Sequence, residues 1–257
     1  MIVDVNVNLS RWPFRRLPHD ETASLVAKLR AAGITEAWAG SFDGLLHKDV
    51  AAVNTRLAAD CEEHDDGLLV PFGSVNPTLP DWQEDLRRCH EEHAMPGIRL
   101  HPGYHGYGLD DPRFAELLQA AAQRNLIVQL VVRMEDERTQ HPLMRVADVD
   151  TARLADLVDA APALRLVVLN GLRSVPRAGV GRLAETGRVW FEIAMQEGVG
   201  GIGNLLELVP LERILFGSHF PLFYLESALL KLQESELGEF QKRAIRSESA
   251  RKLLSRQ

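Results

Sequence analysis

Ile2-Val3-Asp4-Val5-Asn6-Val7-Asn8 is the first strand-like stretch of the chain, and apolar and polar residues alternate strictly along it. Side chains of a strand point alternately to opposite faces, so the aspartate and the two asparagines share one face and the three valines share the other. We expect the valine face to pack against helices. The polar face is expected to line a cavity that holds solvent or a ligand.

Further apolar runs follow, separated by stretches with helical spacing. The strand-like runs cover residues 2–7, 34–40, 68–75, 97–101, 126–132, 164–169, 188–193 and 213–218, and the helical stretches cover about 20–32, 48–64, 80–93, 111–124, 150–161, 174–185, 200–209 and 223–255. Strands that alternate with helices form parallel sheets, and eight such units can close into a barrel. The sequence therefore predicts an α/β fold with one domain over residues 1–257, a single (β/α)8 TIM barrel. An open doubly wound sheet is the alternative.

Composition excludes some classes of partner. The formal net charge is -7 and no run is rich in lysine, which argues against binding to nucleic acid. No segment resembles a membrane span, and the N-terminus lacks a basic region followed by an apolar core, so we expect a cytoplasmic protein without a membrane partner. Cys61 and Cys89 lie far from each other in the sequence and are interpreted as free thiols.

In a barrel of this type the active site lies where the strands end, at the C-terminal mouth. Polar side chains stand at nearly every predicted strand end: Asn6, Asn8, Ser41, Asn76, His101, Arg133, Asn170, Glu192 and His219. We therefore predict that several of these groups meet around one cavity, although a polar surface loop is the simpler explanation for any single one.

Two histidines are the candidate acid or base groups. His101 ends Gly97-Ile-Arg-Leu-His101-Pro102, and His219 ends Arg213-Ile-Leu-Phe-Gly-Ser-His219. An imidazole can accept or donate a proton near neutral pH. Asn170, which precedes Gly171, is the third candidate catalytic residue, with a turn-capping role as its alternative.

Substrate-binding candidates come from the strand ends and two loops. Arg133 begins a long charged loop that contains Glu135 and His141, and such loops often form lids or binding loops. Arg11 lies in a stretch of arginines and aromatics after the first strand. Arginine pairs well with carboxylates, so we predict a small anionic substrate. The complete set of predicted substrate-binding residues is Asn6, Asn8, Arg11, Asn76, Arg133, Glu135 and His141.

At these residues the chain resembles the amidohydrolase-related family of barrel enzymes, in the branch of aminocarboxymuconate-semialdehyde decarboxylase and 2-pyrone-4,6-dicarboxylate lactonase. That family's pattern is an Asp-x-His-x-His first strand, a Gly-x-x-x-His-Pro stretch, a histidine ending the sixth strand, and a Phe-Gly-Ser-Asp-x-Pro stretch. The counterparts here are Asp4-Val-Asn6-Val-Asn8, Gly97-Ile-Arg-Leu-His101-Pro102, Asn170, and Phe216-Gly-Ser-His219-Phe-Pro221. The resemblance spans nearly the whole chain and implies a barrel hydrolase or decarboxylase.

The departures from this pattern bear on the metal. Asn6, Asn8 and Asn170 stand where the family has histidine, and His219 stands where it has aspartate. An asparagine amide oxygen is a weak ligand for a transition metal, so we predict no metal and no other cofactor at the family's position. A relocated site that uses both histidines with Asp4 or Glu192 stays open.

These observations leave three functional hypotheses. The first is a metal-independent hydrolase of a small carboxylated lactone, ester or amide, in which His101 or His219 activates water and the asparagines hold the carbonyl oxygen. The second is a barrel without catalysis that binds a small anion or a partner protein. The third is a decarboxylase with a relocated metal. A homo-oligomer is compatible with each.

Overall fold

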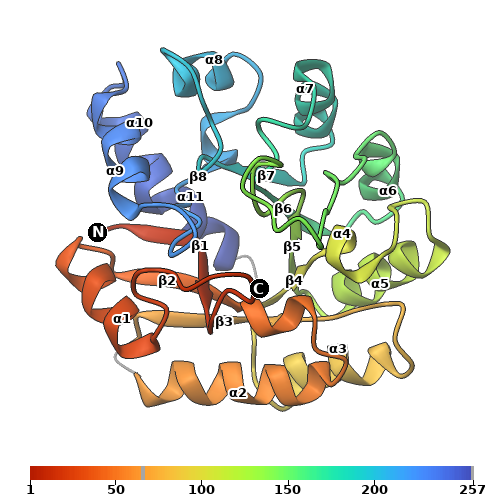
Figure 1. Cartoon of the computed structure of the whole chain (residues 1–257). Helices are drawn as coiled ribbons and strands as arrows, with labels where there is room; N and C mark the ends of the chain where they lie inside the picture. Colours follow the sequence, from red (N-terminus) through yellow and green to blue (C-terminus); the bar gives the residue numbers. More distant parts are fainter. Residues whose placement is uncertain (65–66, 256–257) are drawn as a thin grey trace.

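The computed structural model describes residues 1–64 and 67–255, in which eight parallel strands alternate with helices around a barrel (Figure 1). Each strand pairs with the next one along the chain. This arrangement confirms the predicted (β/α)8 barrel and excludes the open sheet. The strands are β1 (Val3–Leu9), β2 (Glu36–Ser41), β3 (Leu69–Ser74), β4 (Gly97–Leu100), β5 (Ile127–Val131), β6 (Arg165–Leu169), β7 (Val189–Glu192) and β8 (Ile214–Leu215).

The helices surround the strands and match the predicted stretches except for the short helix after β4, which was not predicted, and at the C-terminal end. They are α1 (Thr22–Ala31), α2 (Val50–Glu63), α3 (Trp82–Glu91), α4 (Pro102–His105), α5 (Pro112–Gln123), α6 (Leu154–Asp159), α7 (Arg177–Glu185), α8 (Gly201–Leu206), α9 (Leu225–Glu234), α10 (Glu239–Arg243) and α11 (Ser249–Leu254). Across the described residues, none of them has the length and apolar character needed to cross a membrane.

The prediction of one continuous helix over residues 223–255 is wrong. Helix α9 ends where Ser235 adopts an extended backbone, and the Ser235 hydroxyl donates to the carbonyl of Lys231 in the last turn. Gly238 then precedes α10, and a π-helical turn, Ala244–Glu248, links α10 to α11. Serine and glycine both favour helix ends over helix interiors, which explains the interruption.

The barrel closes between β8 and β1. Although β8 itself is short, the chain continues beside β1, where the Val5 amide donates to Phe216 (3.0 Å) and the Asn8 amide donates to Phe220 (2.9 Å). The segment that ends in His219 therefore lies next to the polar half of β1. This contact brings the first strand and the segment after the last strand to one side of the mouth.

A bulge in β1 changes the predicted alternation. The register of β1 against β2 shifts between Asp4 and Val7. Val3 and Val5 belong to the apolar cluster inside the barrel, whereas Val7 belongs to the outer cluster between strands and helices. The prediction that all three valines share one face is therefore wrong, because a bulge reverses which face later residues occupy.

Helix α11 closes the N-terminal end of the barrel. Its Ala250 and Leu253 belong to the same cluster as the interior side chains of the strands. Arg165 of β6 donates from Nη1 to the carbonyl of Leu253 (2.8 Å). With this end filled, the C-terminal mouth is the end at which a site can form.

Candidate active site at the barrel mouth

Arg99 of β4 forms the floor of the mouth. Its guanidinium is buried and donates to the Gln129 side chain (Nε, 2.7 Å) and the Asn8 side chain (Nη1, 2.8 Å), and to the backbone carbonyls of Val7 and Trp38. No ion pair with Arg99 is present in the described part of the chain. Burial lowers its pKa to about 9, so the group still carries its charge at neutral pH. A fixed positive charge therefore lies beneath the mouth, which favours an anion.

Two polar groups beside Arg99 lack hydrogen-bond partners within the described residues. Asn8 Nδ2 and His101 Nδ1 are both buried, and neither finds an acceptor or donor there. Burial is the main reason that the pKa of His101 lies well below its ordinary value, so its imidazole is neutral at pH 7. Leaving a buried polar group unsatisfied costs about 1–3 kcal/mol, so such groups call for a ligand, a water molecule or a catalytic role.

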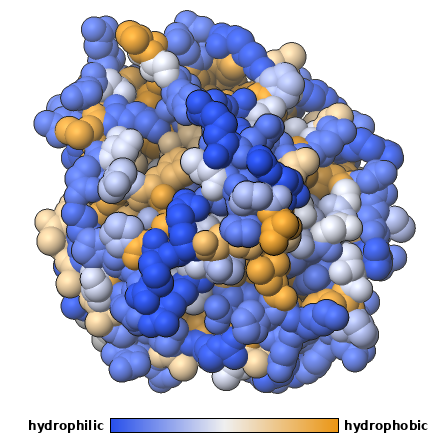
Figure 2. Space-filling model, viewed as in Figure 1, coloured by the Kyte–Doolittle hydropathy of each residue, from blue (hydrophilic) through white to orange (hydrophobic). Residues whose placement is uncertain are grey.

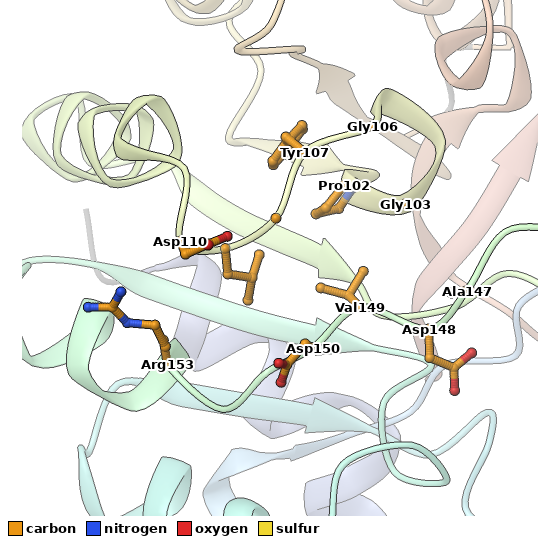
Figure 3. A pocket seen from close by; sticks show the side chains of 12 residues that line it. Pro102, Gly103, Gly106, Tyr107, Asp110, Ala147, Asp148, Val149, Asp150 and Arg153 are labelled. Carbon is orange, nitrogen blue, oxygen red and sulfur yellow. The ribbon is translucent and has the colours of Figure 1, made fainter.

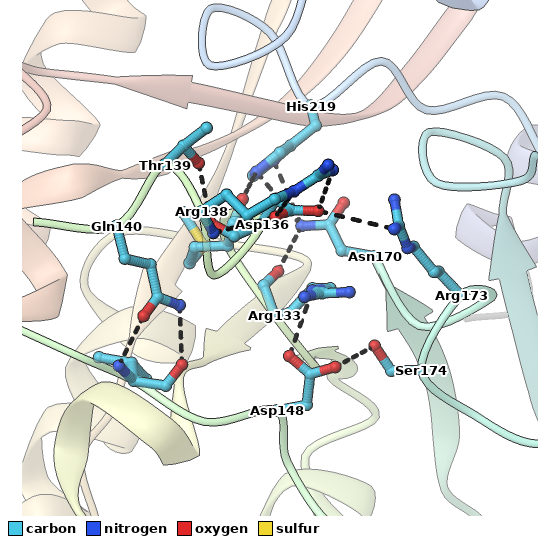
Figure 4. Close-up of polar contacts among 12 residues, drawn as sticks. Arg133, Asp136, Arg138, Thr139, Gln140, Asp148, Asn170, Arg173, Ser174 and His219 are labelled. Carbon is cyan, nitrogen blue, oxygen red and sulfur yellow. Dashed lines mark hydrogen bonds and ion pairs between the residues drawn. The ribbon is translucent and has the colours of Figure 1, made fainter.

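Asn6, Asn170 and His219 form a network of polar contacts on the other side of the mouth, and Figure 4 shows Asn170 and His219 beneath the lid segment. Asn6 Nδ2 donates to Asn170 Oδ1 (2.9 Å), and Asn170 Nδ2 donates to the Arg133 carbonyl (2.9 Å). His219 Nε2 lies 2.9 Å from the Met134 carbonyl. A carbonyl only accepts, so Nε2 carries the proton, and Asn170 Nδ2 lies 3.3 Å from Nδ1 and 3.4 Å from Nε2 of the same ring.

This network contacts both nitrogens of His219. Burial lowers the pKa of His219 to about 4, so the ring is neutral at pH 7. Both residues also have left-handed backbone, with φ of 56° for Asn170 and 60° for His219. Asparagine and histidine tolerate this conformation better than most residues. In this arrangement the two side chains hold the backbone carbonyls of the segment after β5.

That segment, residues 133–149, covers the mouth, and we call it the lid. Asp136 of the lid pairs with Arg173 from the loop after β6 (3.6 Å), and Asp148 accepts from Ser174 of the same loop. Arg133 pairs through Nε with Asp148 (3.2 Å) and is about one-tenth exposed. Figure 4 shows these contacts joining the lid to the β6 side. The sequence-based expectation of a lid thus has a structural counterpart.

The loop after β1 meets the lid from the opposite side. Trp12 is buried and packs edge to face against Phe42 (5.1 Å between ring centroids) and Phe14 (5.4 Å). Arg15 forms an ion pair with Glu135 of the lid, whose other carboxylate oxygen is buried without a partner among the described residues. These contacts fill the mouth. A cavity of about 10 Å³, bordered by His101 and Arg133, lies beneath the lid.

The predicted site residues divide into two groups. His101, His219, Asn170, Asn6, Asn8, Arg133 and Glu135 are buried at or under the lid. Arg11 instead pairs with Glu21 on the surface, Asn76 Oδ1 accepts from the amide and hydroxyl of Thr78, and His141 is exposed and stacks on Phe14. The structure does not bring these three side chains into the cluster, and their predicted roles remain untested.

Sequence reasoning missed two arginines that the structure places at the mouth. Arg99 shares the face of His101, so the alternation of β4 already carried a signal for it. Arg15 shared a stretch with Arg11, and only the fold shows which of the two reaches the lid.

The buried carboxylates near the mouth already have partners. Asp4 accepts from the Ser218 amide (3.0 Å) and hydroxyl (2.5 Å), and Glu192 accepts from the Asn170 amide (2.6 Å). Burial raises the pKa of Asp4 to about 7 and raises the pKa of Glu192. Within the described residues, no group of three or more His, Cys, Asp or Glu side chains could hold a metal. The donors therefore do not fit a transition metal.

A second pocket of about 410 Å³ lies outside the lid, between it and the segment after β4 (Figure 3). Its polar lining includes Asp110, Asp148, Asp150 and Arg153. The surrounding surface is mostly hydrophilic, with separate apolar patches, on the face that Figure 2 shows. This pocket is open to solvent, and the lid separates it from the buried groups at the mouth.

A sequence model of the amidohydrolase family matches residues 10–256. The chain belongs to the amidohydrolase family. Solved structures that resemble this chain include 5-carboxyvanillate decarboxylase from Sphingomonas paucimobilis (10% identity, 98% of each chain covered, TM-score 0.78). Others are an amidohydrolase II (15%, 99% of each chain, 0.75) and a dihydroxybenzoic acid decarboxylase from a Polaromonas species with bound manganese (11%, 98% of this chain and 96% of that one, 0.74). No curated protein matches the sequence. At these identities the neighbours support the fold of the amidohydrolase alone.

Proposed function

We propose that the chain is a hydrolase that acts on a small carboxylated lactone, ester or amide at the barrel mouth, without the metal of its family. The observation that carries this proposal is the pair of unsatisfied groups beside Arg99, a neutral imidazole on His101 and a free amide donor on Asn8. A base and a donor are the two groups that carbonyl hydrolysis by water needs. The positive charge of Arg99 and the nearby Arg133 favour a substrate with a carboxylate.

The chemistry assigns one role to each group. His101 accepts a proton from water as the water oxygen bonds to the substrate carbonyl carbon, and Asn8 Nδ2 donates to the oxygen that becomes negative. The tetrahedral intermediate then breaks its bond to the leaving oxygen or nitrogen, which takes the proton from His101. The products are a carboxylic acid and an alcohol or amine, and His101 returns to its neutral form.

Asn170 and His219 have a positioning role in this proposal. Their side chains bind the carbonyls of Arg133 and Met134, so they hold the lid over the mouth. A substrate needs far more volume than the cavity beneath the lid provides, so the lid has to move before binding. Release of these contacts and of the pair between Arg15 and Glu135 would open the mouth.

The test is turnover of a panel of carboxylated lactones, esters and amides, with 5-carboxyvanillate added to detect decarboxylation. Loss of a general base typically lowers the rate by about 10²–10⁴-fold, so we expect His101→Gln to lower kcat/KM at least 100-fold. His90→Gln, which changes an exposed histidine on α3, is the matched control and should leave kcat/KM unchanged. Activity of His101→Gln within threefold of the unaltered protein would remove this mechanism.

The filled mouth favours a second candidate function, a barrel that binds a small anion or a partner protein without catalysis. Trp12 and the aromatic side chains around it occupy the space where a substrate would lie. Carboxylates that bind but are not converted, with equal affinity in His101→Gln, would support this function over hydrolysis. Elemental analysis of protein purified without chelator tests the metal, because stoichiometric manganese or zinc would contradict the metal-free proposal.

A further inference from the structure

A groove of about 490 Å³ lies between the loop after β1 and the loop between β8 and α9. One wall carries Arg15, Arg16 and His19, and the other carries Phe220 and Phe223. Basic and aromatic side chains thus face each other across a space of small-molecule size. The groove lies next to the mouth. Arg15 connects the two, because its side chain lines the groove and forms an ion pair with Glu135 of the lid.

The cations of the groove differ in how far they are already neutralised. Arg16 holds Asp20 through two hydrogen bonds of 2.6 and 2.8 Å, and Lys28 pairs with Glu226. Arg15 contacts a carboxylate through Nη1 alone, and its side chain is 43% exposed. In the described part of the chain, its Nε and Nη2 groups have no acceptor. Arg15 is therefore the arginine of this groove whose Nε and Nη2 groups stay available to hold a carboxylate side by side, because Arg16 uses the same two groups on Asp20.

The apolar wall of the groove indicates which group a ligand carries besides its anionic group. Phe220 is buried and its ring lies 5.9 Å from the ring of His19, and Phe223 packs against His219 behind the groove. Rings of this kind bind planar apolar bodies through their faces and edges. A carboxylate on a planar ring would satisfy both walls, since arginine pairs with carboxylates through two parallel hydrogen bonds.

We propose that this groove is a second binding site, separate from the barrel mouth, for a small aromatic carboxylate whose carboxylate group binds Arg15. Glu135 competes for the same guanidinium from the lid side, and its second oxygen is buried without a described partner, so the closed pair is incompletely satisfied. Ligand binding in the groove therefore weakens one of the contacts that hold the lid. Arg15 is the side chain through which a ligand in the groove affects the closed mouth.

The experiment measures binding of 6-fluoro-2-naphthoate by ¹⁹F NMR to the full chain. Arg15→Gln should weaken binding at least tenfold, and Arg15→Lys should weaken it less. Glu135→Gln should tighten binding several-fold, because a neutral amide competes less for Arg15. Arg153→Gln, in the pocket outside the lid, is the matched control and should change the affinity by less than twofold.

Three outcomes would overturn the inference. Equal weakening by Arg15→Gln and Glu135→Gln would mean that the ion pair matters and the groove does not. Loss of binding in Arg133→Gln with retention in Arg15→Gln would place the probe in the mouth. Absence of saturable binding at millimolar probe would exclude the site. His101→Gln should leave probe binding unchanged, so this result is independent of whether the chain is a hydrolase.

Discussion

The two sides of the barrel mouth differ in how their buried polar groups are used. On the β6 and β8 side, Asn170 and His219 contact each other, and their side chains also form hydrogen bonds with Asn6 and with lid carbonyls. On the β4 side, Asn8 and His101 each keep a buried group without a described partner. Satisfied groups fix geometry, whereas unsatisfied groups are available to a ligand. Asn170 and His219 therefore hold the lid, whereas the groups beside Arg99 are the ones that a ligand can reach.

The largest expected effect is a difference in the free energy of unfolding between a variant of one side and a variant of the other. Asn170→Ala removes three side-chain hydrogen bonds and places alanine at a left-handed φ of 56°, so we expect a loss of about 4 kcal/mol in the free energy of unfolding. Asn8→Ala removes one bond to Arg99, and we expect about 2 kcal/mol. Chemical denaturation at pH 7 measures both. Equal losses would contradict the division of the mouth into two sides.

Acidification should lower stability through His219, in addition to the effect of His101, whose pKa is also lowered. The folded pKa of His219 is about 4 against an ordinary value of 6.5, so the unfolded chain binds more protons between these values and stability falls as pH drops from 6.5 to 4. The contribution is at most about 3 kcal/mol. His219→Gln retains a donor for Met134 and does not titrate, so it should flatten this part of the stability curve.

The titration of Asp4 changes stability in the opposite direction as pH falls, so Asp4 provides the control. Its pKa is raised from 3.8 to about 7, so the folded protein binds more protons in this interval and gains stability as pH falls through it. In Asp4→Asn the acid loss should therefore become steeper. A stability curve that His219→Gln leaves unchanged between pH 6.5 and 4 would show that the network does not depend on a neutral imidazole.

The smallest effect tests a residue that lies outside both sides. Arg11 forms an exposed pair with Glu21 at the surface. Exposed pairs contribute little, so Arg11→Gln should change the free energy of unfolding by less than about 0.5 kcal/mol and leave kcat/KM on the substrate panel unchanged. A clear loss of kcat/KM would restore the role in substrate binding that the sequence predicted for Arg11, and would place it at the mouth in the open form.

The sequence predicted the barrel because hydrophobic periodicity is local and strong, and it also predicted most residues of the mouth. Strand-end positions such as Asn6, His101 and Asn170 follow from alternation once the strands are known. The bulge in β1 could not be predicted, since it arises from the pairing of β1 with its neighbours. The hydrogen-bond partners of His219 could not be predicted either, because the Met134 carbonyl lies 85 positions away in the chain.

The bulge in β1 separates the barrel interior into a dry lower part, with Val3 and Val5, and an upper part that carries the two asparagines. Substitutions at Asn6 and Asn8 therefore act on the polar part of the strand, while Val3 and Val5 keep their packing below it. One strand thus joins a packed floor to a polar wall, and the register shift marks the boundary between them.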